Sequence, residues 1–344
     1  MILEKNKFLW SFHYFRAFAI LNIILIHTWR LPKNSSYVYG ANLVDNTRDM
    51  LFHGSTIYFL FISGFLFHYL SYRFTIRSYY LGKFKNVVVP YIIISVFLIF
   101  AEDFTGSKAN IPLLNYLYII PEKLIKGTAS FQFWYIPFII IVFLISPIFL
   151  KIKSKTFTKY IPLLFLLPIL GTRTTVYITF WQFAYFLPPY LLGIYTSMNF
   201  DFVMNLVKKY FRVLCLVAII TSVCLLFVAK YEVYYNLLSP RESLVYLQKV
   251  SITFIILHLS REINENRYPF LNTIANCSFA LYFTHVIFDR HLKKIYYLVD
   301  SYTSDFFKIP LSLFYVLILV LVSVLFCIIV KRVLGKNSRY FIGY

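Results

Sequence analysis

The apolar residues of this chain fall into long runs bounded by charged residues, without the regular polar face that a soluble helix shows. Uncharged stretches cover residues 50–72, 131–150, 174–200, 268–288 and 310–330. About 20 apolar residues are needed for one helix to cross the hydrocarbon core of a bilayer. The pattern therefore predicts a protein that crosses a membrane many times.

We predict an all-α, polytopic membrane fold with about ten transmembrane helices. Their expected positions are residues 8–29, 51–72, 86–102, 131–150, 159–172, 177–197, 212–229, 244–260, 269–289 and 309–331. The fifth helix is the weakest, because only thirteen uncharged residues separate Lys159 from Arg173. No internal repeat or long linker is visible, so residues 1–344 are interpreted as one integral-membrane domain.

Composition and charge distribution support this interpretation. Hydrophobic residues make up 60% of the chain and charged residues 14%, and the mean hydropathy of +0.69 excludes a soluble domain of this length. With ten helices, the face holding both termini carries nineteen basic and four acidic residues, which predicts cytoplasmic termini. The net charge of +20 thus indicates topology, not nucleic-acid binding, although a basic face would attract anionic lipid headgroups.

The cysteines indicate neither a disulfide framework nor a metal site. Cys215, Cys224, Cys277 and Cys327 are scattered over apolar segments, and no two of them show the CxxC spacing. The first apolar stretch contains Arg16 and lacks a small-residue cleavage pattern, so we expect a retained helix and not a cleaved signal peptide.

Arg16 and His27 are the most informative polar residues, because both lie inside the first apolar segment. Eleven residues amount to about three helical turns, so the two side chains should face the same way, about 16 Å apart along the axis. Ionisable residues within a membrane helix are costly and usually functional. The pair predicts a site that extends across much of the membrane.

Other polar residues are expected at the depth of His27. His285 lies in the ninth helix, which runs in the same direction as the first, and Gln132, Trp134 and Tyr135 begin the fourth. An imidazole as base, side-chain amides as oxyanion donors and a gap left by small residues would suit acyl transfer. Transport pathways use the same residue types, so these residues alone leave both functions open.

Five segments, in order along the chain, resemble the signature elements of the acyltransferase-3 family of membrane O-acyltransferases. They are Arg16 and His27 in the first helix, the Phe59–Phe65 stretch ending in Ser-Gly-Phe, Lys83-Phe84-Lys85 before Pro90-Tyr91, Phe133-Trp134-Tyr135, and Phe279 to His285. Each element is weak alone, but five in order on a ten-helix frame are fairly specific.

The resemblance implies a bacterial inner-membrane enzyme that transfers an acyl group, usually acetyl, from cytosolic acyl-CoA to a hydroxyl of a surface glycan or its lipid-linked precursor. No tightly bound cofactor is expected, since acetyl-CoA would be a substrate. His27 would be the essential base and Arg16 its partner, and His285 is a further catalytic candidate.

An acyl-CoA donor and a hydroxyl acceptor suggest candidates for binding the two substrates, although the cations among them are also typical of ordinary positive-inside charge. Cations for the phosphates of CoA would come from the connection after the second helix, namely Lys83, Lys85, Arg73 and Arg77. The substrate-binding candidates are Trp134, Tyr135, Ser63 and Tyr282, although Ser63-Gly64 is also typical of a packing notch between helices.

Two other classes of membrane protein fit less well. A transporter or glycan flippase would usually contain related halves or Gly/Pro-broken helices in matching positions, and the sequence shows neither. A membrane glycosyltransferase would need carboxylates at its site, whereas the acidic residues of the outer face lie mostly in predicted loops.

Overall fold

A computed structural model describes residues 8–31, 41–105, 112–170, 178–228, 239–263 and 265–344, and within these ranges all regular secondary structure is helical. The helices are α1 (Trp10–Thr28), α2 (Ala41–Phe52), α3 (Thr56–Tyr69), α4 (Ile76–Lys83), α5 (Val89–Thr105), α6 (Tyr116–Lys126), α7 (Tyr135–Phe149), α8 (Ser154–Leu170), α9 (Phe180–Met198), α10 (Phe200–Lys209), α11 (Phe211–Phe227), α12 (Pro240–Ser260), α13 (Pro269–Ser301), α14 (Asp305–Leu334) and α15 (Ser338–Phe341).

Several of these helices are suited to a bilayer. Six helical stretches in the described part of the chain are long and apolar enough to cross a membrane, or seven if the bent pair of α10 and α11 forms one span. They confirm a multi-pass helical protein. The count of ten spans and the cytoplasmic position of both termini stay predictions.

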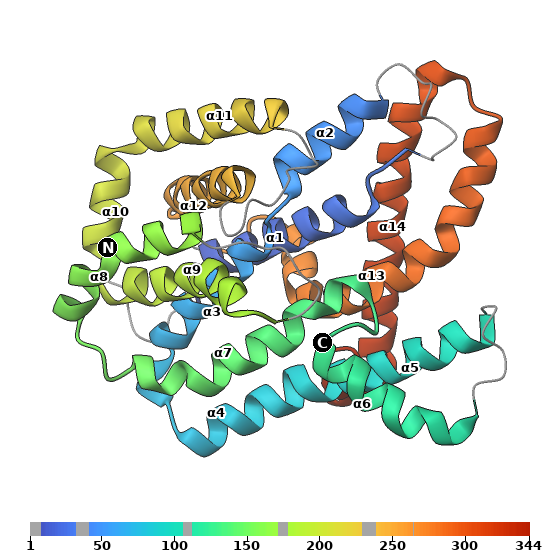
Figure 1. Ribbon diagram of the computed structural model, residues 1–344, viewed down its shortest axis with the longest axis horizontal. Coiled ribbons are helices and arrows are strands. Elements are labelled where there is room, and N and C mark those ends of the chain that lie inside the picture. The colour runs from blue at the N-terminus through green and yellow to red at the C-terminus, as the bar shows by residue number, and fades with distance from the viewer. Residues whose placement is uncertain (1–7, 32–40, 106–111, 171–177, 229–238, 264) are drawn as a thin grey trace.

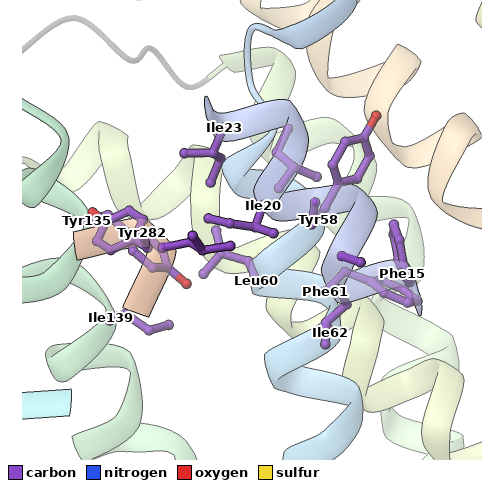
Figure 2. Packing of buried hydrophobic residues seen from close by; sticks show 14 of the residues in the cluster. Phe15, Ile20, Ile23, Tyr58, Leu60, Phe61, Ile62, Tyr135, Ile139 and Tyr282 are labelled. Carbon is purple, nitrogen blue, oxygen red and sulfur yellow. The ribbon is translucent and has the colours of Figure 1, made fainter. Parts of the chain in front are cut away.

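Helix α1 lies in the middle of the bundle and packs most extensively along α13 (Figure 1). It also contacts α2, α3, α12 and α14. Figure 2 shows the packing beside it, where Ile20 and Ile23 of α1 lie near Tyr58 and Leu60 of α3. Because neighbours surround it, the polar side chains of α1 are shielded from lipid, and this permits an arginine and two histidines in the helix.

The closest helix pair is α3 with α9, and two glycines make it possible. A Cβ atom on Gly64 would lie 1.9 Å from the carbonyl oxygen of Tyr190, and one on Gly193 would lie 2.1 Å from that of Phe61. Small residues let membrane helices approach with their backbones in contact. The Ser63-Gly64 step is therefore a packing notch, as the sequence suggested.

The observed helices depart from the predicted spans in several places, and α4 and α10 also lie outside them. The predicted span 51–72 begins ten residues earlier, at Ala41, and is broken between Phe52 and Thr56. Helix α13 continues to Ser301, well beyond the predicted end at residue 289, and α6 was not predicted. Positions 171, 172, 177 and 229, at the ends of predicted spans, lie outside the described residues.

Candidate functional site

Arg16 and His27 face the same helix, α13. The Arg16 Nη2 atom donates a hydrogen bond of 2.9 Å to the Ser278 hydroxyl. The His27 ring stacks on the His285 ring, with centroids 5.8 Å apart and planes inclined by 20°. Ser278 and His285 are seven residues apart, close to two helical turns. The predicted common orientation of the pair is confirmed, and α1 and α13 run in the same direction.

His27 lies in the wall of a small cavity, of about 50 Å³. One water molecule needs roughly 10–15 Å³ measured in this way, so the space accommodates only a few atoms. Three of the predicted substrate-binding residues, Trp134, Tyr135 and Tyr282, line it together with Gln132. The rest of the wall is formed by Ile23, Ile26, Phe52, Gly54, Ser55, Thr56, Phe59 and Phe279.

Arg16 lines a second and larger cavity, of about 270 Å³, which also includes Ser63 and Asn86. Three residues belong to both cavities: Phe59, Tyr135 and Phe279. These three side chains form an aromatic wall between the space beside Arg16 and the space beside His27. The two cavities therefore adjoin along one line through the bundle.

His285 is fully buried, and its hydrogen bonding assigns its tautomer. The Nδ1 atom lies 2.7 Å from the Leu281 carbonyl oxygen, which can only accept, so Nδ1 carries the proton. The Nε2 atom has no partner within the described residues. Asp289, one turn later, binds Arg30 and Tyr315, each at 2.8 Å. The His285 ring is thus buried and its orientation is fixed beside His27.

Of the four predicted CoA-binding cations, only Lys83 lines a described cavity. Its Nζ atom lies 3.8 Å from the centroid of the Phe143 ring, and the apolar cavity there measures about 320 Å³. Phe143 also lines the Arg16 cavity, so the two spaces adjoin. Lys85, Arg73 and Arg77 are exposed.

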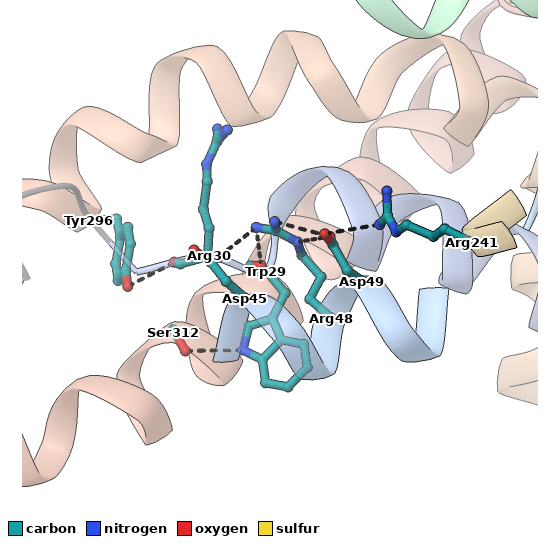
Figure 3. Close-up of polar contacts among 8 residues, drawn as sticks. All are labelled: Trp29, Arg30, Asp45, Arg48, Asp49, Arg241, Tyr296 and Ser312. Atoms are coloured by element: carbon teal, nitrogen blue, oxygen red, sulfur yellow. Dashed lines mark hydrogen bonds and ion pairs between the residues drawn. The ribbon is translucent and has the colours of Figure 1, made fainter. Parts of the chain in front are cut away.

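A polar network fixes the end of α1 next to His27 (Figure 3). The Trp29 carbonyl accepts a hydrogen bond from Arg48, and its indole N–H donates to Ser312 of α14. Arg48 in turn pairs with Asp45 at 3.0 Å and with Asp49 at 3.3 Å. Because α2 and α14 both bind this end of the helix, the position of His27 is fixed from two sides.

Sequence reasoning missed several residues that shape the site. Serine is common in membrane helices, so the sequence did not single out Ser278, and only its hydrogen bond with Arg16 shows that it belongs to the site. Phe59 and Phe279 stood in motifs without an assigned role, yet both belong to the aromatic wall. Among the described residues, no three His, Cys, Asp or Glu side chains gather as a metal site would require.

One comparison with known proteins gives a match. Residues 9–332 match a family described as an acyltransferase domain, and this range includes all the residues discussed above except the last few of the chain. No curated protein and no solved structure matches the chain.

Proposed function

The chain belongs to the acyltransferase-3 family, and from this premise we propose that it transfers an acetyl group from acetyl-CoA to a hydroxyl of a surface glycan or its lipid-linked precursor. That it is a membrane acyltransferase follows from the family and the apolar helices. The donor, the acceptor and the roles of individual residues are our proposal. We expect the enzyme in the bacterial inner membrane.

The observation that carries the proposal is the adjoining pair of cavities, one beside Arg16 and one beside His27. A thioester entering from the Arg16 cavity would bring its acyl group to the aromatic wall, directly before the His27 ring. The cations around Lys83 would hold the phosphates of CoA behind it. The small volume beside His27 favours acetyl over longer acyl groups.

His27 would act as the general base. A sugar hydroxyl is a weak nucleophile at neutral pH, and a positioned imidazole that accepts its proton typically contributes 10²- to 10⁴-fold in rate. Arg16, bound to Ser278, would place a fixed positive charge on the donor side. His285 would support the His27 ring by stacking, which keeps it oriented toward the cavity.

Mass spectrometry of surface glycans, from cells with and without this protein, tests the reaction. We expect an added mass of one acetyl group per modified sugar only when the protein is present. Glycans of identical mass in the two strains would contradict the proposed acceptor class.

The role of His27 is tested by His27→Ala, compared with His68→Ala as a matched control. His68 binds Ser197 at the end of α3 and lines neither the Arg16 cavity nor the His27 cavity. We expect His27→Ala to abolish acetylation, by at least about 100-fold, and His68→Ala to retain it. Equal acetylation by both variants, at equal protein levels, would remove His27 from the mechanism.

A further inference from the structure

The wall of the His27 cavity contains a helix break that the sequence did not predict. Helix α2 ends at Phe52 and α3 begins at Thr56, and between them Gly54 adopts a positive φ of 76°. A Cβ atom there would also lie 2.3 Å from the Cγ1 atom of Val245, so only glycine fits. Gly54, Ser55 and Thr56 all line the cavity.

Helix α12 holds the broken end of α2 in place. Gln248 donates a hydrogen bond of 3.0 Å to the Met50 carbonyl, and the Lys249 Nζ atom donates one of 2.6 Å to the Leu51 carbonyl. Lys249 is fully buried, with 0% of its surface exposed. This hydrogen bond satisfies one of the carbonyl groups that the end of α2 leaves without an intrahelical partner. The break is thus supported from outside the cavity and has a fixed geometry.

The break leaves the N-terminus of α3 at the cavity. The N–H groups of Ile57 and Tyr58 bond to the Gly54 and Ser55 carbonyls, which makes a tight first turn. Thr56 stands at the start of that helix, in the cavity wall. A helix N-terminus carries about half a positive charge and favours an anion.

An unpaired amide lies in the same wall. Gln132 is 2% exposed, its Oε1 atom accepts a hydrogen bond of 2.6 Å from Ser130, and its backbone carbonyl accepts one from Tyr282. The Gln132 Nε2 atom has no partner among the described residues. A buried donor left unpaired has lost its hydrogen bond to water, so a ligand that accepts from it would recover that loss.

We propose that Gln132 Nε2 and the N-terminus of α3 form the oxyanion hole of the transfer reaction. The inference rests on the proposed function. The hydroxyl oxygen of the acceptor bonds to the thioester carbon while His27 takes the hydroxyl proton, and the carbonyl π electrons move to the oxygen. This oxyanion accepts a hydrogen bond from Gln132 Nε2 and is stabilised by the positive end of the α3 dipole. The C–S bond then breaks, the carbonyl re-forms, and the thiolate of CoA receives the proton from His27.

The test uses Gln132→Met, which keeps the length of the side chain and removes the donor. Washed membranes supply the native acceptor, and acetyl-CoA radiolabelled in the acetyl group is the donor. Removing one oxyanion donor typically lowers kcat by about 10²- to 10³-fold. We expect that loss in kcat with the apparent KM for acetyl-CoA nearly unchanged, because the bond strengthens only as the charge develops. The matched control is Gln182→Met, a buried amide at the start of α9, which should retain kcat.

The outcomes separate the two proposals. Absence of labelled glycan with the wild-type protein would refute the proposed function itself. If Gln132→Met keeps the wild-type kcat, or only raises the KM for acetyl-CoA, the oxyanion hole alone would be overturned. If Gln132→Met lowers the yield of folded protein, Gln132→Glu keeps the shape but places a carboxylate oxygen at the donor position. The same loss of kcat is then expected, and wild-type kcat in that variant would overturn the inference.

Discussion

The contact of α3 with α9 allows a quantitative prediction for Gly64→Ala. The new Cβ atom would lie 1.9 Å from the Tyr190 carbonyl oxygen, whereas an ordinary contact begins near 3.4 Å, so the helices must separate by up to about 1.5 Å. Overpacking costs about 1–3 kcal/mol, and a backbone oxygen cannot rotate away, which places this substitution at the upper end of that range. Alanine recovers up to about 1 kcal/mol of helix propensity, so we expect a net loss of about 2 kcal/mol.

Gly82→Ala is the matched control, because Gly82 is also helical but a Cβ atom added there would meet no neighbouring side chain or other helix within 4 Å. Gly82→Ala should raise the free energy of unfolding by about 0.5–1 kcal/mol. Equilibrium unfolding in mixed micelles, followed by tryptophan fluorescence, measures both variants against the wild-type protein. Gly64→Ala as stable as wild type, or both variants shifted in the same direction, would refute the steric explanation.

The reciprocal glycine provides a second check on the same contact. Gly193→Ala should destabilise by a similar amount, since its Cβ atom meets the Phe61 carbonyl oxygen at 2.1 Å. Once one alanine has separated α3 from α9, the second has more space. The double variant should therefore lose less unfolding free energy than the two single variants lose together. Full additivity would show that the helices had not moved apart.

Two further predictions concern lysines. Lys249→Met leaves the Leu51 carbonyl without its donor and should lower the free energy of unfolding by about 1–3 kcal/mol, and unchanged stability in the same micelle assay would show that this cap is dispensable. Replacing Lys83 and Lys85 together should raise the apparent KM for acetyl-CoA more than it lowers kcat. Lys85→Ala alone should give most of that rise in KM, most clearly at low salt, because Lys83 is partly enclosed against Phe143 whereas Lys85 is exposed. If Lys83→Ala alone caused the rise, the assignment of phosphate binding to Lys85 would be wrong.

Local periodicity was sufficient to predict the orientation of Arg16 and His27. Eleven residues bring two side chains to one face of any helix, and the contacts with Ser278 and His285 follow that rule. The helical class was equally accessible, because long apolar runs allow few alternatives in lipid.

The break at Gly54 could not be predicted in the same way. It depends on Lys249, almost two hundred residues away, which compensates the carbonyls released at Leu51. The end of α13 was missed for another reason: hydropathy reports burial in lipid, whereas residues 290–301 remain helical although they are rich in charge. A hydropathy pattern reports neither tertiary contacts nor helices that continue outside the bilayer.

The aromatic wall has a consequence for the cell that is separate from catalysis. Phe59, Tyr135 and Phe279 divide what would otherwise be one continuous passage along α1. An open passage with a histidine at one end would conduct protons and discharge the membrane potential. With the three rings between the two cavities, the proposed acyl transfer would need no open passage for ions.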